Sequence, residues 1–353
     1  MGRSRAKKAL RFEPTDMIPS MEFITGLSAE NLLAVTGVDP RAEFHGCMLK
    51  LIERMQLDIN GPLPGLDELA GPLEAAETSG QEDWGLTKGD QVADGARQSL
   101  RFDGPEDVLK FEPLAWDSRS EAELLEQFKA DHRRNVEMFG RRCVAEEDIY
   151  TTLFHWCIDT FGWENFMLAA GDDEKRFEEI LLQFKELSIR RTRAWAKVDE
   201  LEFFICHDDL CMTSGPVFRP DWYRKYIFPH YADIWSPVKA AGVPVVFASD
   251  GNYMPLADDI AACGPDGLFF DHTMDLSAMV KKFGGGKLLF GGPDVRVLTF
   301  GSTDDVAAEL RRVFEATAGV KGYFFCTAGS LTHNIPLANL ETYIRLSGEL
   351  RAG

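Results

Sequence analysis

The sequence lacks any apolar run near the roughly 20 residues that a membrane-spanning helix requires, so it predicts no membrane span. Its first residues, MGRSRAKKALRFEP, are basic but have no apolar stretch of the kind that a secretory signal contains. Seven widely spaced cysteines form no CxxC pair, which is typical of reduced thiols and not of a disulfide framework. Together these absences predict a cytoplasmic protein.

Positive charge is also scarce. The chain has 38 Lys and Arg against 57 Asp and Glu, which gives a net charge of −19. So acidic a surface repels phosphate backbones and anionic lipids, which excludes nucleic acid and membrane surfaces as expected partners. No GxGxxG follows a predicted strand and no Walker A motif occurs, which weakens a nucleotide-binding interpretation. A small molecule or another protein is the expected partner.

What the sequence does contain is a regular alternation of strand-like and helix-like segments. Most of the strand-like runs are apolar and bounded by Gly or Pro, as parallel strands buried on both faces are. They number eight and lie near residues 18–24, 57–60, 142–146, 201–206, 243–248, 267–271, 287–291 and 322–326. We therefore expect a (β/α)8 barrel over residues 1–353, with residues 61–120 as an insertion of loops and short strands. A doubly wound open sheet is the alternative.

Three of the helical patterns are clear enough to be placed. One begins with Asp39 as a plausible N-cap and Pro40 as the first helical residue. Another covers residues 122–140, and a long amphipathic helix is expected over 172–198 with one of the two aspartates at its start as the cap.

Polar residues recur where the predicted strands end, most clearly in FFICHDDL, residues 203–210. In a (β/α)8 barrel the carboxyl ends of all strands meet on one face, and the active site lies there. We therefore expect the polar groups at these strand ends to converge. They are Glu22, Glu146, Glu147, Asp148, His207, Asp208, Asp209, Asp250, Asp271, His272, Asp294, Cys326 and Thr327.

Several of these residues have simpler explanations. Asp208 and Asp209 could cap the following turn, and Asp250 precedes Gly-Asn and could be a turn aspartate. Cys326 lies in an aromatic strand, where a buried inert thiol is the favoured explanation. Glu22 is harder to dismiss, because a carboxylate inside the apolar run MEFI must face a polar site or be paired.

The remaining histidines are not assigned to the site by position alone. His45 and His132 fall in helical patterns and are expected at the surface, whereas His155, His230 and His333 are undecided.

Segments along nearly the whole chain resemble the uroporphyrinogen decarboxylase superfamily in order and spacing. They are ALRFEPTDMIPSMEF, the DWG at 83–85, FGWENFMLAAGDDEKRFEEIL, HDDLCMTSGPVFRPDWYRKYIFPHY, KAAGVPVVFASDGN, GPDGLFFDHTMDLSAMVKKFGGGKLLFGGPD and IPLANL. The resemblance implies a (β/α)8 barrel, in agreement with the strand count. It also implies one of two chemistries, decarboxylation of a porphyrinogen or cobalamin-dependent methyl transfer.

The decarboxylases of this superfamily hold their substrate's carboxylates with an arginine-rich segment just after the first strand. The corresponding segment here reads MEFITGLSAEN and contains no arginine. A site for a polyanion needs such cationic clamps. The resemblance therefore favours the methyltransferase branch.

Many methyltransferases of the superfamily bind zinc through a His-x-Cys pair after strand 5 and a cysteine near strand 8. The matching positions here are Ala248, Asp250 and Gly329, so that zinc site is absent as such. Other groups on the same face could hold zinc or another divalent metal, and we predict the set Glu147, His207, Asp250 and Cys326. An acid or Lewis acid is needed in any case, because an ether oxygen is a poor leaving group.

The resulting hypothesis is an O-demethylating methyltransferase that passes a methyl group from a small methylated substrate to a separate corrinoid protein. The predicted catalytic residues are Glu22, His207, Asp209 and Asp250. The predicted substrate-binding residues are Glu147, Asp271, His272 and His333. Cobalamin is expected on the partner, because the chain shows no evident cobalamin-binding module. The alternatives are a decarboxylase and a non-catalytic binding barrel.

Overall fold

The computed structural model describes residues 2–24, 26–61, 100–139, 141–327 and 329–353. It divides into two compact units, each considered by itself below. The first comprises Met1–Glu82, Arg133–Glu146 and Gly267–Gly353, and the second comprises Asp83–His132 and Glu147–Asp266. Most of the predicted insertion over 61–120, including the DWG motif, lies outside the described residues.

The strands of the first unit are parallel. β1 (Met21–Glu22) pairs with β2 (Ile59–Asn60), which pairs with β3 (Val144–Ala145). β10 (Leu288–Gly291) lies between β9 (Gly267–Phe270) and β11 (Tyr323–Phe325). A parallel bridge from Ser20 to Phe325 joins the two sets, so the start of β1 lies beside β11.

Helices follow most of these strands, as expected for parallel strands that need crossover connections. The helices of the first unit are α1 (Gly2–Ala9), α2 (Ala29–Thr36), α3 (Phe44–Met55), α14 (Leu276–Phe283), α15 (Val295–Phe300), α16 (Thr303–Ala316) and α17 (Leu337–Arg351). A buried ion-pair network fastens the two ends of the chain to β2. Asp58 accepts from Arg5 Nη1 at 2.7 Å and from Arg351 Nη2 at 2.8 Å.

The second unit has its own parallel strands. β5 (Phe204–His207) lies between β4 (Asp148–Ile149) and β8 (Val245–Ser249). A small antiparallel hairpin of β6 (Cys211–Met212) and β7 (Gly215–Pro216) follows β5. The sequence did not predict this hairpin.

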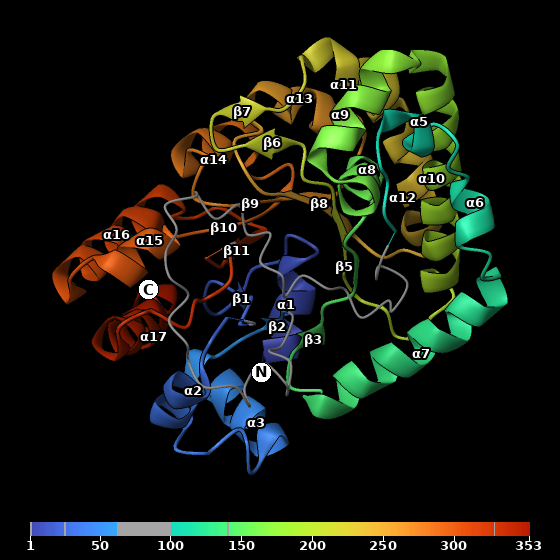
Figure 1. Ribbon diagram of the computed structural model, residues 1–353. Coiled ribbons are helices and arrows are strands. Elements are labelled where there is room, and N and C mark those ends of the chain that lie inside the picture. The colour runs from blue at the N-terminus through green and yellow to red at the C-terminus, as the bar shows by residue number, and fades with distance from the viewer. Residues whose placement is uncertain (1, 25, 62–99, 140, 328) are drawn as a thin grey trace. The chain divides into compact units, whose positions relative to one another are not determined.

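The second unit is richer in helix. Its helices are α5 (Pro105–Val108), α6 (Pro113–Trp116), α7 (Glu121–Met138, which continues into the first unit), α8 (Phe154–Phe161), α9 (Trp163–Asp172), α10 (Glu174–Trp195), α11 (Pro220–Tyr226), α12 (Phe228–Ala240), η1 (Met254–Leu256) and α13 (Ala257–Ala262). In Figure 1, α10 runs beside α12, and Lys185 Nζ on α10 lies 2.7 Å from Asp233 Oδ2 on α12. Trp156 of α8 stacks on Phe184 of α10 with ring centroids 5.4 Å apart.

The predicted helices are confirmed with one correction. Helix α10 begins after Asp173, whose carboxylate accepts from the Arg176 amide at 3.0 Å. The helix expected from Pro40 instead starts at Phe44, because the backbone carbonyl of Asp39 closes a turn with the amides of the third and fourth residues after it. The Asp39-Pro40 pair therefore makes a turn and does not cap a helix.

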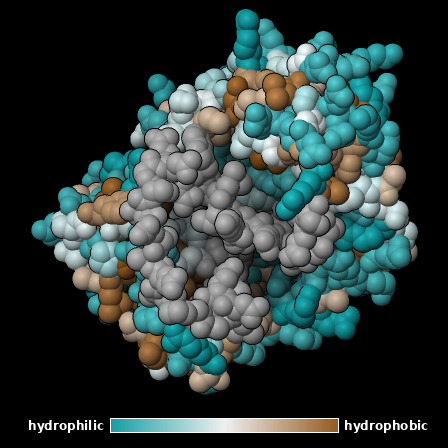
Figure 2. Space-filling view, viewed as in Figure 1, coloured by the Kyte–Doolittle hydropathy of each residue, from teal (hydrophilic) through white to brown (hydrophobic). Residues whose placement is uncertain are grey.

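All eight predicted strand positions contain a strand, and a further short strand, β4, follows the third position. The alternation of parallel strands and helices confirms the α/β class of the (β/α)8 fold. None of the described helices is both long enough and apolar enough to cross a membrane. Hydrophilic side chains predominate on the face drawn in Figure 2 outside its grey atoms, as the acidic composition predicts.

Candidate active site

Three polar residues lie at the end of β5 and just after it, and each has different partners. They are His207, Asp208 and Asp209. Asp208 is fully buried and accepts from the amides of Phe154, at 3.0 Å, and His155, at 2.7 Å. Its carboxylate also accepts from the Tyr231 hydroxyl at 2.7 Å. Burial raises the pKa of Asp208 despite these donors. Asp208 thus caps the first turn of α8, which lies more than 50 residues earlier in the chain, and not the turn after β5 that the sequence suggested.

His207 lies at the end of β5 and is 12% exposed. Its ring stacks on Tyr150, with centroids 4.9 Å apart, and its Nε2 lies 3.6 Å from Oδ2 of Asp148. Burial lowers the pKa of His207 to about 4, so the ring is neutral near pH 7 and the contact with Asp148 is not a full ion pair. A neutral imidazole beside a carboxylate can accept a proton or bind a metal.

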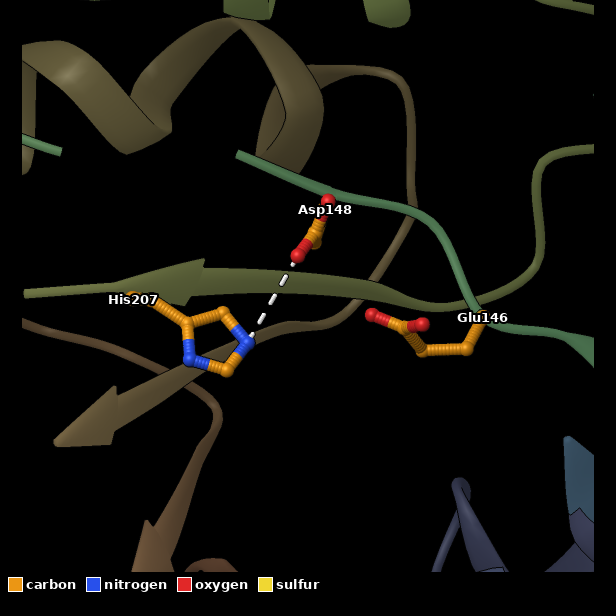
Figure 3. A group of neighbouring side chains, drawn as sticks. All are labelled: Glu146, Asp148 and His207. Carbon is orange, nitrogen blue, oxygen red and sulfur yellow. Dashed lines mark ion pairs between the residues drawn. The ribbon is translucent and has the colours of Figure 1, made fainter. Parts of the chain in front are cut away.

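The chain around β4 is extended, so its side chains point alternately to opposite sides, and one side faces His207. Glu146, Asp148 and His207 each offer a ligand atom within 4.8 Å of the others (Figure 3). In an extended chain, alternate side chains point the same way, so Glu146 and Asp148 share a side and Glu147 points away. Glu147 Oε1 instead lies 2.8 Å from His132 Nδ1, and both residues are buried. The prediction that His132 lies at the surface is therefore wrong.

Asp209 is one of two half-buried carboxylates that flank the buried ring of His155. The ring nitrogens of His155 lie 3.3 Å from Asp209 Oδ2 and 3.1 Å from Asp159 Oδ1, at ion-pair distance but without hydrogen-bond alignment. Burial disfavours the charged ring, but the two carboxylates outweigh it and raise the pKa of His155 to about 10. Burial likewise acts to raise the pKa of Asp209, but His155 and a backbone amide lower it overall.

Asp250 follows β8 and begins a turn, and a hydrogen bond to the side chain of Asp209 stabilises this turn. The Asp250 amide donates to Asp209 Oδ1 at 2.8 Å. The next residue, Gly251, has a φ of +79°, and a Cβ there would come within 2.5 Å of the Cys211 carbonyl. Glycine is therefore required at this position. The predicted residues His207, Asp209 and Asp250 thus belong to neighbouring strands of the second unit.

Glu22 lies in the first unit, where its carboxylate is surrounded by neutral donors. It accepts from the Thr327 amide at 3.1 Å and from the Thr327 hydroxyl at 2.7 Å, and the Tyr343 hydroxyl donates to it as well. Burial raises the pKa of Glu22 to about 7. This carboxylate ties β1 to the segment after β11 and to α17. Its predicted catalytic role stays a prediction.

Asp271 and His272 line a cavity of about 400 Å³ in the first unit. Its other walls include Phe270, Leu276 and Arg312, so it has both apolar and charged sides. The two residues that were predicted to bind substrate thus face one cavity.

The other two predicted residues of the first unit have different surroundings. His333 is exposed, and Cys326 is 1% exposed at the end of β11. The predicted metal set of Glu147, His207, Asp250 and Cys326 draws on both units and stays a prediction. None of the seven cysteines, all within the described residues, takes part in a disulfide.

Sequence reasoning did not assign three residues that the structure brings to this region. His155 and Asp159 are four residues apart on α8, a spacing that places both on one face of a helix. His132 follows Leu124 and Phe128 at intervals of four, which is the buried face of α7. Both spacings are visible in the sequence.

Comparisons with known proteins place the chain in a family. A family model described as uroporphyrinogen decarboxylase (URO-D) matches residues 162–349, which is more than half of the chain. The chain belongs to the uroporphyrinogen decarboxylase family.

The relatives differ in what they are called. The chain is 27% identical over 133 residues to a uroporphyrinogen decarboxylase of Thermus thermophilus, and 26% identical over 125 residues to that of Syntrophotalea carbinolica. The first match spans 38% of that relative's length and 38% of this chain. A methyltransferase from Methanosarcina mazei is similar in structure, with a TM-score of 0.63 and 20% identity, over 99% of this chain and 98% of that one. This structural likeness confirms the fold.

Proposed function

We propose that the protein is a methyltransferase that moves a methyl group from a small methylated substrate to a separate corrinoid protein. The observation that carries this proposal is the charge at the strand ends of the second unit. Residues 146–161, 203–218 and 245–260 follow or contain β4, β5 and β8, and they include no Lys or Arg. They do include Asp148, Asp209 and Asp250.

A porphyrinogen with several carboxylates needs cationic partners that are fixed in place. The segment from Phe12 to Pro40, which contains β1, also has no Lys or Arg. His155 is the charged cation in the site of the second unit, and two carboxylates of the chain already flank it. A small neutral or cationic substrate fits these strand ends better than a polyanion.

In the proposed reaction, an acid must act on the group that leaves the methyl carbon. Asp250 is the partly exposed carboxylate beside Asp209, and we assign it to the proton transfer. Asp209 orients the Asp250 turn and contributes to substrate positioning. Glu22, Asp271, His272 and His333 keep their predicted roles as proposals for the first unit.

A divalent metal also fits residues of this region. His207 Nε2 and Asp148 Oδ2 are 3.6 Å apart, within the roughly 3–4 Å that separates two ligands of one ion when bonds are about 2.1 Å. Because Glu147 turns to His132, we propose Asp148 as the carboxylate ligand beside His207, in place of Glu147. A bound zinc or similar ion would supply a Lewis acid at the leaving atom.

Decarboxylation is the second candidate, and the names of the curated relatives favour it. It predicts carbon dioxide release from uroporphyrinogen, for which the strand ends of the second unit and the segment from Phe12 to Pro40 offer no Lys or Arg. A cytoplasmic location and a corrinoid-carrying partner are parts of the methyltransferase proposal.

The test is incubation with a reduced cobalt(I) corrinoid protein and a panel of methylated ethers, phenols and amines. Formation of methylcobalt(III), seen as a spectral change that depends on this protein, is the expected result. No methylcobalt(III) with any donor, together with tight donor binding, would favour a non-catalytic binding barrel.

A further inference from the structure

We propose that His155 is a positioning residue of this site, which fixes Asp209 and, through Asp209, the turn that carries Asp250. The inference rests on the proposed function only in taking Asp250 as an active group. His155 is 1% exposed on α8 and does not reach the solvent side of the site. It acts through Asp209, whose side chain is 17% exposed.

The position of the His155 ring is fixed from several elements. Asp159 faces one ring nitrogen from the next turn of α8, and Asp209 faces the other from the end of β5. Tyr150 meets the ring edge to face, with centroids 5.0 Å apart. The carboxylate of Asp208 accepts from the His155 amide, so the start of α8 is itself held by β5. The His155 ring is therefore held in a fixed position relative to the end of β5.

The charge of the ring matters because of what surrounds it. Two carboxylates, Asp159 and Asp209, face the ring directly, and Asp208, His207 and Tyr150 are the other titratable groups packed near it. Residues 146–161, 203–218 and 245–260 supply no Lys or Arg that could take its place. A neutral side chain at position 155 would remove the positive charge that faces two half-buried carboxylates, and partly desolvated carboxylates are destabilised when a facing cation is removed.

The effect of His155 on Asp209 reaches Asp250 through one hydrogen bond. Asp209 Oδ1 accepts from the Asp250 amide, while Oδ2 faces His155. If Asp209 loses its cation and rotates, the Asp250 amide loses its acceptor. The turn at Asp250–Gly251 then becomes less ordered, although no atom of His155 touches it.

The experiment compares His155→Gln, Asp159→Asn and the matched control His45→Gln, an exposed histidine of the first unit. We expect amide hydrogen exchange at Asp250 to accelerate at least about tenfold in His155→Gln, less in Asp159→Asn, and not at all in His45→Gln. In the methyl-transfer assay, kcat of His155→Gln should fall roughly 100-fold while KM changes by less than about threefold. Unchanged exchange at Asp250 in a folded His155→Gln variant would overturn the proposal.

A second measurement needs no variant. The ring nitrogens of His155 in the native protein, labelled with ¹⁵N, should both carry a proton from pH 6 to above pH 8, as expected for an imidazolium between two carboxylates. A neutral ring at pH 7 would overturn the proposal even if His155→Gln fails to fold. Neither exchange nor NMR requires a methyl donor, so absence of methyl transfer in the native protein would refute the proposed function and leave this inference standing.

Discussion

Glu22 is a buried carboxylate and Asp209 a half-buried one, both at strand ends, and their pKa values shift in opposite directions. In the first unit, Glu22 meets only neutral donors from Thr327 and Tyr343, and burial raises its pKa to about 7. In the second unit, Asp209 lies against the charged ring of His155, and its pKa is lowered. Burial acts to raise the pKa of both carboxylates, and the charge of His155 turns the shift of Asp209 downward.

The two protonation states suit two different structural roles. A carboxyl group that is protonated near neutral pH can hold strands together without a counter-charge. A carboxylate that stays ionised can orient a neighbouring turn and attract a hydrogen-bond donor. Only the second kind has a partly exposed active group, Asp250, attached to it.

The largest expected effect comes from the second unit. Asp250→Ala should lower the rate of methyl transfer about 100-fold or more, on the order of 3 kcal/mol, because it removes the proposed acid. Single-turnover formation of methylcobalt(III) measures it. An Asp250→Ala variant with near-native rate would break the assignment of chemistry to this unit.

In the first unit, substitution of Glu22 should change the pH dependence of the free energy of unfolding. The pKa of Glu22 is raised in the folded state from 4.5 to about 7, so its contribution is fully present below pH 4.5 and is lost as the pH rises to about 7. Glu22→Gln cannot titrate. Between pH 4 and pH 8 the native protein should therefore lose roughly 3 kcal/mol of unfolding free energy relative to the Glu22→Gln variant.

Urea unfolding at a series of pH values measures this difference. Asp58 and Asp16 titrate in both proteins, so their contributions cancel. A constant difference from pH 4 to pH 8 would show that Glu22 is not protonated in the native fold near neutral pH.

A smaller effect tests the alternation around β4. Asp148→Ala should weaken binding of a divalent ion at least about tenfold, whereas Glu147→Ala should change it little, because Glu147 faces His132. Zinc titration followed by elemental analysis makes the comparison. Equal losses in the two variants would contradict the assignment of opposite sides to these neighbours.

The smallest expected effect serves as a control for removal of a carboxylate. Asp173→Ala deletes the side-chain cap of α10 and should lower the free energy of unfolding by about 1 kcal/mol. Methyl transfer should be unaffected, because Asp173 lies at the start of α10, outside the site. A large loss of activity in this variant would mean that activity follows stability and not the site.

Much of the fold could be predicted from the sequence because its signals are local. Short apolar runs, most of them bounded by Gly or Pro, marked the eight strand positions, and the aspartates at 172 and 173 marked the start of α10. The start of α3 could not be placed this way, because Asp39-Pro40 fits a turn as well as a helix start. The hairpin of β6 and β7 lacks any apolar alternation.

The site was harder to predict because it depends on pairing across the sequence. The segment HDDL was recognised, but nothing in it shows that Asp208 would cap α8 while Asp209 would meet His155. These partners come from residues more than 50 positions earlier. The choice of Glu147 over Asp148 overlooked the two-residue period of an extended chain, which the sequence does contain.

The central claim is that this member of the uroporphyrinogen decarboxylase family transfers methyl groups and does not decarboxylate a porphyrinogen. The most direct measurement runs both reactions with one preparation, using uroporphyrinogen with detection of carbon dioxide, and ¹³C-labelled methyl donors with a cobalt(I) corrinoid protein. The account predicts labelled methylcobalt(III) and no carbon dioxide above the level of a protein-free blank. Carbon dioxide release that depends on the protein, without methylcobalt(III) from any donor, would contradict it.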